Sequence, residues 1–329
     1  MDRQKQRRHF LLAAGASAVS SLPSLVLGQE RYPARPVKVV VPFAPGGNAD
    51  ATARIFTEAL SKQLGQPFVV ENKAGAGGMI GAAAAVKSEP DGYTLLCATP
   101  GPILAAWQLP GASANYSLAD MRAVALLTVV PNVLVVNASS PIKEFVDLVK
   151  WAKSSQKIKA VGHPGNGTTG HVNLLQLQKA LSTEFTIAGY KGSGPAVTDL
   201  LGGQLDLVAT DLPSAHQLIK AGKLRAIATI ARYRAPALLD VRTMAELQLP
   251  QVDATNFTAI MAPRKLPDVV ARRLTDGVRA ALATETVRKQ IDNIGTFPVR
   301  MTTLEFESFL QQQAGIYGAL VKAGLLKAD

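Results

Sequence analysis

The segment from Val37 to Ala53 constrains the fold of this chain most strongly. It reads VKVVVPFAPGGNADATA: an apolar β-branched run, a Gly-rich turn and a helix-like stretch. This order predicts a strand at 37–42 and a helix from Asp50 to about Leu64. The first N–H groups of a helix have no intrahelical partners and lie at the positive end of its dipole, so the turn favours an anion. It lacks the Lys of a phosphate loop and the third Gly of a dinucleotide loop, so a carboxylate suits it better than a nucleotide.

The first 28 residues have the pattern of an export leader. A paired arginine, Arg7-Arg8, precedes an apolar stretch that runs to about Leu27 and is broken by Pro23. The stretch is too short for a membrane span, so we expect a signal peptide of the twin-arginine type and a periplasmic protein. Gln6 stands where Ser or Thr is usual, which leaves the general secretory route open. A buried N-terminal helix or a membrane anchor is the other alternative.

Composition narrows the choice of partners. The formal charge of +11 becomes +8 without the first 28 residues, which hold four basic residues and one acidic residue. The excess is spread along the chain and is not interleaved with aromatic residues, so we expect attraction of small anions and no binding of nucleic acid. The single cysteine, Cys97, lies in an apolar strand, where burial is expected rather than a role as nucleophile.

Strand and helix patterns alternate along the chain, which predicts an α/β fold with largely parallel sheets. About 300 residues remain after the leader, and that length suits two lobes. We expect lobe 1 to comprise residues 29–130 and 257–329, and lobe 2 residues 131–256, with crossings near Pro131 and at 255–262. Other strands are expected at 68–71, 93–98, 158–162, 185–188, 205–211 and 224–230. Other helices are expected at 80–87, 145–153, 170–181, 196–201, 214–221, 269–282 and 304–320.

Four units of strand, glycine turn and helix are present, two in each predicted lobe. Their turns lie at 43–47, 74–78, 163–169 and 190–195. In open α/β sheets, ligands bind beyond the carboxyl ends of the strands, where such turns converge. Two lobes joined by two crossings form a cleft that closes by hinge motion. This architecture is typical of a binding protein.

Several longer motifs give the chain a resemblance to a known family. They are PFAPGGNAD (42–50), VVENKAGAGGMIGA (69–82), DGYTLL (91–96), PNVLVVN (131–137), GNGTTGH (165–171), YKGSGPAVTDLLGGQLDL (190–207) and LPSAHQLIKAGKLRAIA (212–228). In this order and spacing they resemble the extracytoplasmic solute receptors of the tripartite tricarboxylate transporter system, the Bug receptors. The resemblance covers nearly the whole chain.

The resemblance implies a two-lobed class II periplasmic-binding-protein fold with two crossover strands and a central cleft. It implies a monomeric receptor without enzymatic activity, cofactor or metal. Such a receptor captures a small organic carboxylate and delivers it to a permease made of one large and one small subunit, or reports the ligand to a sensor kinase. An exported α/β hydrolase is a further alternative with poor support, because the sequence around Ser193 lacks the spacing of a nucleophile elbow.

In the first lobe, the resemblance implies that the main chain of one loop holds a ligand carboxylate. That loop comprises Phe43, Ala44, Pro45, Gly46, Gly47 and Asn48. Backbone amides make charge-assisted hydrogen bonds to carboxylates, although the residues alone also fit a tight connection without ligand. Asp50 either caps the helix or contacts a ligand ammonium. The second loop, with Ala76, Gly77 and Gly78, either approaches the ligand or only packs the helix on the strand.

In the second lobe, the resemblance places Gly165, Gly167 and Thr168 in a loop that faces the cleft, and Lys191 and Gly192 in the fourth glycine turn. Lys191 is either a cation near the site or a solvated charge at its rim. Two further residues carry open alternatives. His163 stands where the family usually has Ser, and it is either a ligand contact or structural. Asp211 either selects an amino group on the ligand or caps the following helix.

A further loop, which follows the strand expected at 93–98, departs from the family pattern. Thr99-Pro-Gly-Pro102 replaces a more polar loop, and its prolines remove backbone donors. We place Thr99 in the site and expect a less polar pocket wall, suited to a ligand with an apolar or aromatic body. Zinc is not expected, because His163 and His171 lack a third ligand at a recognisable spacing, and His171 is expected to pack in the core.

Overall fold

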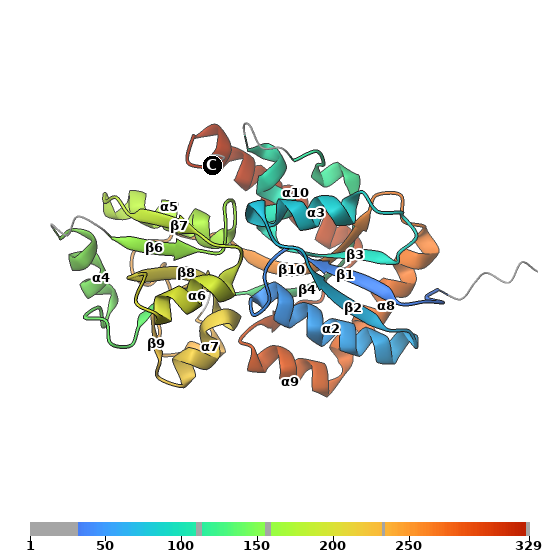
Figure 1. The fold of residues 1–329 in the computed structure, drawn as a ribbon, viewed down its shortest axis with the longest axis horizontal. Coiled ribbons are helices and arrows are strands. Elements are labelled where there is room, and N and C mark those ends of the chain that lie inside the picture. The colour runs from blue at the N-terminus through green and yellow to red at the C-terminus, as the bar shows by residue number, and fades with distance from the viewer. Residues whose placement is uncertain (1–31, 110–113, 155–158, 232–233, 327–329) are drawn as a thin grey trace, which may run out of the picture. The chain divides into compact units, whose positions relative to one another are not determined.

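The described chain is built around two β-sheets. The computed structural model describes residues 32–109, 114–154, 159–231 and 234–326, and the predicted leader lies outside them. One sheet has the strand order β11-β4-β10-β3-β1-β2, and the other has the order β7-β6-β8-β5-β9 (Figure 1). The strands are β1 (Val37–Val41), β2 (Phe68–Asn72), β3 (Thr94–Ala98), β4 (Met121–Val130), β5 (Asn132–Asn137), β6 (Ala160–His163), β7 (Thr186–Gly189), β8 (Leu207–Asp211), β9 (Leu224–Ile230), β10 (Asn256–Pro263) and β11 (Phe297–Pro298).

Both sheets mix parallel and antiparallel pairs. β1 pairs in parallel with β2 and β3, as β6 does with β7 and β8. The pairs made by β4, β5 and β10 are antiparallel, so the prediction of largely parallel sheets is right only for the strand–helix–strand units. The chain leaves the six-stranded sheet at Pro131, between β4 and β5, and returns to it with β10. These two passages cross between the sheets, and they position the site.

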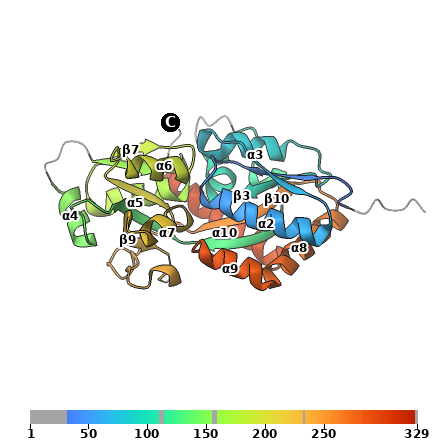
Figure 2. The same ribbon diagram turned by 60° about the horizontal axis from the view of Figure 1, so that its bottom comes forward.

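Helices cover both faces of each sheet. They are α2 (Asn48–Leu64), α3 (Met79–Val86), α4 (Phe145–Ala152), α5 (Thr169–Leu181), α6 (Ser193–Leu201), α7 (Leu212–Lys220), α8 (Asp268–Ala283), α9 (Glu285–Asn293) and α10 (Thr303–Lys322). Helices α2, α8 and α9 pack together along one face of the six-stranded sheet, while α3 and α10 cover the other (Figure 2). No helix of the described residues is long and apolar enough to cross a membrane.

The five-stranded sheet shows how side-chain alternation divides the core. Along β5, Leu134 and Val136 face the cluster formed with α4 and α5, whereas Val133 and Val135 face the cluster formed with α6 and α7. Because successive side chains of a strand point to opposite faces, an uninterrupted apolar run is what a strand buried on both faces requires.

Several short elements were not predicted from the sequence. The helix α9 and the two-residue strand β11 follow α8, and the segment after Thr99 forms a turn of π-helix (Gly101–Ala105) and then a 3₁₀ turn (Ala106–Gln108). Helix α9 buries only Val287 and Ile291, too few apolar positions for a clear helical period.

Candidate ligand-binding site

A pocket lies where the two sheets approach each other. It holds about 450 Å³ of empty space including its open mouth. It is lined by six residues assigned to the site from the sequence, Phe43, Gly47, Asn48, Thr99, Thr168 and Asp211. Five further lining residues belong to loops that were predicted to face the cleft, namely Pro100, Gly101, Pro164, Thr169 and Ser193. Ala49, Asn132 and Asn256 were not predicted. None of these lining residues is basic.

The N-termini of four helices meet at this pocket. Gly47, the N-cap of α2, and Thr168, the N-cap of α5, both line it, as do Ser193 at the start of α6 and Asp211, the N-cap of α7. No side chain caps α2 or α6, so their first N–H groups have no side-chain acceptor. The positive ends of four dipoles therefore converge on one volume, and this arrangement favours an anion without any cationic side chain.

Two asparagines of the crossing strands form the floor of the pocket. Asn132 is the first residue of β5 and Asn256 the first of β10. The Nδ2 of Asn256 donates to Oδ1 of Asn132 at 3.2 Å, and Nδ2 of Asn132 donates to the carbonyl of Ala254 at 3.2 Å. Both residues are buried. The two crossings are thus hydrogen-bonded to each other directly beneath the site.

The glycine turns of the two halves also contact each other. The N–H of Ala44 donates to the carbonyl of Lys191 at 2.9 Å, across from the six-stranded to the five-stranded side. A Cβ built on Gly77 would lie 2.3 Å from the carbonyl oxygen of Asn166, and one on Gly101 would lie 3.1 Å from Cα of Thr168. The structure is therefore closed at the pocket mouth, with main chain against main chain.

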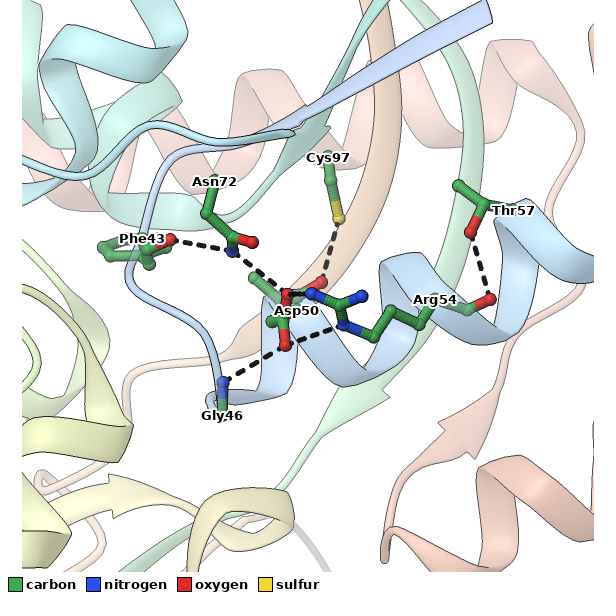
Figure 3. Close-up of polar contacts among 8 residues, drawn as sticks. Phe43, Gly46, Asp50, Arg54, Thr57, Asn72 and Cys97 are labelled. Carbon is green, nitrogen blue, oxygen red and sulfur yellow. Dashed lines mark hydrogen bonds and ion pairs between the residues drawn. The ribbon is translucent and has the colours of Figure 1, made fainter. Parts of the chain in front are cut away.

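Asp50 lies behind the first loop and fixes its shape (Figure 3). Its carboxylate accepts from Gly46 N at 3.1 Å, from Arg54 Nη2 at 3.0 Å and from Asn72 Nδ2 at 3.0 Å. The same Asn72 amide donates to the Phe43 carbonyl at 3.0 Å. Burial tends to raise the pKa of Asp50, but the hydrogen bonds from Arg54, Asn72 and Gly46 outweigh it and lower the pKa.

Asp211 is the acidic side chain in the pocket wall, and it caps α7. Its carboxylate accepts from the backbone N–H of Ser214 at 3.1 Å, from Oγ of Ser214 at 2.5 Å and from Oγ of Ser193. Burial raises its pKa, against the lowering effect of the hydrogen bonds from Ser193 and Ser214. The capping role expected as one alternative is therefore present, and the carboxyl also borders the ligand volume.

His163 does not line the pocket. Its ring stacks on that of His171 with centroids 4.3 Å apart, and its Nδ1 accepts from the N–H of Gly165 at 3.1 Å. The Nδ1 of His171 likewise accepts from Gly167 at 3.3 Å. The two imidazoles thus hold the loop between β6 and α5 from behind, which is the structural alternative for His163.

Stability should fall at acidic pH because of His163. Burial, and then the neighbouring His171, lower its pKa from 6.5 to about 3. As pH falls below 6.5 the unfolded chain gains a proton that the folded chain does not, so the free energy of unfolding decreases by up to about 1.4 kcal/mol per pH unit until pH nears 3. The His163→Asn variant keeps a hydrogen-bond acceptor but does not titrate in this range. Its free energy of unfolding, measured with urea at pH values between 6.5 and 5, should therefore fall less steeply with decreasing pH than that of the wild type. Parallel slopes would contradict this assignment.

Cys97 should be inert in the folded protein. It is fully buried, its Sγ lies 3.4 Å from the carbonyl oxygen of Ala49, and burial followed by the charge of Asp50 raises its pKa above the usual thiol range. We expect iodoacetamide at pH 8 to alkylate the native protein at least ~100-fold more slowly than the urea-unfolded protein. Mass spectrometry of timed samples measures both rates, and equal rates would show that the thiol is accessible.

The remaining residues that sequence reasoning assigned to the site do not line the pocket in this structure. They are Ala44, Pro45, Gly46, Asp50, Ala76, Gly77, Gly78, His163, Gly165, Gly167, Lys191 and Gly192. Several instead form the contacts between the glycine turns, and Lys191 is exposed, with its carbonyl rather than its ammonium group at the contact. Among the described residues, no group of three His, Cys, Asp or Glu side chains is arranged to hold a metal ion.

Asn132 and Asn256 were missed, although the sequence holds a signal for the first. A polar residue directly after Pro131 interrupts two apolar runs. Its side chain would be costly to bury without partners, so its presence at a crossing indicated either a polar network or a ligand.

Comparison with known proteins agrees with this geometry. A family model described as "Tripartite tricarboxylate transporter family receptor" matches residues 52–326. BugT of Bordetella pertussis is 33% identical over 314 residues, which cover 95% of this chain and 94% of BugT.

Two solved structures carry organic acids. MatC from Rhodopseudomonas palustris with bound malate has a TM-score of 0.83, 31% identity, and coverage of 88% of this chain and 100% of MatC. Rpa4515 of R. palustris with adipate has a TM-score of 0.85, 30% identity, and coverage of 90% of this chain and 99% of that one. With the two-sheet fold and the pocket between the sheets, these matches show that the chain belongs to the tripartite tricarboxylate transporter receptor family, among its Bug-type members.

Proposed function

We propose that this protein captures a small organic carboxylate between its two lobes and hands it to a tripartite tricarboxylate transporter permease. The observation that carries the proposal is the convergence of four helix N-termini on a pocket without a basic lining residue. Preorganised N–H groups bind a carboxylate by charge-assisted hydrogen bonds and need little reorganisation to do so. The carboxylate-bound relatives, MatC with malate and Rpa4515 with adipate, support the same class of ligand.

The pocket wall favours a carboxylate that also carries an apolar part and a hydrogen-bond donor. Phe43, Pro100 and Pro164 supply apolar surface, while Asp211 offers an acceptor. A hydroxyl or ammonium group on the ligand body, away from the bound carboxylate, would pair with Asp211, whereas a second carboxylate there would meet a like charge. The Thr99–Pro102 departure points in the same direction, because it replaces a polar loop with prolines.

Native mass spectrometry of the exported protein tests the ligand class directly. We expect a co-purified acid that denaturation releases. Calorimetric titration with malate, adipate, benzoate and 4-hydroxybenzoate then ranks the candidates, with 4-hydroxybenzoate ahead of benzoate because its hydroxyl reaches an acceptor. Failure of every carboxylate to bind at millimolar concentration would refute the receptor function, and preference for malate over both aromatic acids would refute the apolar wall.

Delivery to a permease separates the proposal from its alternative, reporting to a sensor kinase. The family match supports the transporter role. Crosslinking of the ligand-loaded protein to membranes of its source, followed by identification of the captured subunits, distinguishes the two. Capture of a large and a small permease subunit is expected, and capture of a kinase alone would favour the sensing role.

A further inference from the structure

A second cavity borders the crossing strands, and nearly all of its lining residues differ from those of the candidate site. It holds about 1,460 Å³ of empty space including its mouth, more than the front pocket. Its walls come from β4 and β11, from α10, from the end of β9 and from the crossings themselves. Asn256 lines both this hinge cavity and the front pocket. A molecule in the hinge cavity would thus touch both lobes at their pivot.

The side chains of the hinge cavity define what fits. Phe297, Met301 and Phe309 supply a broad apolar surface. Gln313 is only 9% exposed and lines the cavity, and neither end of its side-chain amide has a hydrogen-bond partner among the residues that the structure describes. Its amide atoms are not enclosed by protein, so a donor and an acceptor are both available to a molecule in the cavity.

The charges at the cavity argue against an ion. Arg234 lines it, but its Nε lies 3.0 Å from each carboxylate oxygen of Glu246, and its Nη1 donates to the carbonyl of Leu239 at 2.8 Å. Asp253 adds a negative charge to the same wall. The guanidinium is therefore already neutralised, so an anion finds no free counter-charge among the described residues of the wall. The Asp253 carboxylate is exposed to solvent, which weakens its attraction for a cation.

We propose that the hinge cavity is a second ligand site, for an uncharged molecule with a flat apolar body and a carboxamide-like group that pairs with Gln313. In this proposal the crossings act as a pivot between the two cavities, so that closing the front pocket widens the hinge cavity and opening it narrows that space. An occupant of the hinge cavity holds the lobes closed. It therefore raises the affinity of the front pocket for its ligand. This coupling, unlike the binding itself, rests on the proposed carboxylate function.

The binding step is tested with 2-naphthamide as probe, titrated calorimetrically into the full mature protein. We expect one saturable site, and about tenfold weaker binding to Gln313→Leu, which keeps the volume but removes the amide. Gln311→Leu makes the same change two residues earlier on α10, outside the cavity lining, and should bind as the wild type does. Met301→Trp fills the mouth from a side chain that is 40% exposed, so it should fold normally and abolish binding.

If 2-naphthamide shows no saturable binding, or binds Gln313→Leu as tightly as the wild type, the proposed site is wrong. So does mutual exclusion between the probe and the carboxylate, because it places the probe in the front pocket. If the probe binds as expected, saturating probe should lower the carboxylate Kd about fivefold, and the carboxylate should lower the probe Kd by the same factor. An unchanged carboxylate Kd overturns the coupling. If no carboxylate binds at all, the proposed function fails, while the probe titrations still decide the site.

Discussion

Replacing Gly77 by alanine is expected to weaken carboxylate binding about 100-fold. Gly77 has φ +60°, and a Cβ there would lie 2.3 Å from the main-chain oxygen of Asn166 on the opposite side of the pocket mouth. A carbonyl oxygen cannot rotate away as a side chain does, so the two halves must separate. If closure becomes less favourable by about 3 kcal/mol, the apparent Kd of the carboxylate rises about 100-fold.

A matched variant separates closure from backbone strain. Gly222 has φ +66°, but a Cβ there would have no atom within 4 Å. Gly222→Ala thus carries the same left-handed strain, of order 1 kcal/mol, without touching the pocket. Both variants should lose similar thermal stability, measured by circular dichroism, and only Gly77→Ala should lose affinity in calorimetry. Normal affinity in Gly77→Ala would mean that the closed contact is not needed for binding.

Replacing Asn48 by aspartate is expected to weaken binding by 100-fold or more. Asn48 lines the pocket at the start of α2, where its Nδ2 donates to Oγ1 of Thr258 at 2.8 Å and its Oδ1 accepts from Oγ1 of Thr52 at 3.2 Å. The change is nearly isosteric and places a negative charge at the helix N-terminus. If the new carboxylate lies about 5 Å from the ligand carboxylate, and the effective dielectric constant is about 20, the two charges repel each other by about 3 kcal/mol.

The fold should survive this change, because the Thr258 hydroxyl can turn to donate and a negative charge suits a helix N-terminus. Asn293→Asp is the control. It adds the same charge at an exposed position at the end of α9, and should leave the Kd within about twofold. Calorimetry with the tightest acid of the panel measures both. Equal affinity in Asn48→Asp and wild type would show that the carboxylate does not approach α2.

Local sequence patterns predicted the order of most elements and placed the starts of α2, α6 and α7 within a few residues of their observed positions. The run 37–41 with its glycine turn, for example, is β1 followed by α2, although α2 starts at Asn48 rather than Asp50. Glycine N-caps leave no side-chain signal for the first helical residue. The short α9 and β11 were missed because they bury few apolar side chains.

The pocket was only partly predictable. Residues next to a helix start, such as Gly47, Asn48 and Thr168, line it because helix direction alone brings them there. Asn132 and Asn256 are 124 positions apart, and only the pairing of the crossing strands in three dimensions brings them together. Conversely, Gly77 and Lys191 lie in the expected turns but meet the opposite half, because closure packs the turns against each other.

The measurement that tests the central claim most directly is a paired titration of an acid and its amide. 4-Hydroxybenzoate and 4-hydroxybenzamide have nearly the same length and shape, but only the acid carries charge. If converging helix N-termini hold the ligand, the acid should bind at least ~100-fold more tightly than the amide at pH 7.5, because charged acceptors make much stronger bonds to N–H groups. Equal affinity for the two compounds would contradict the account.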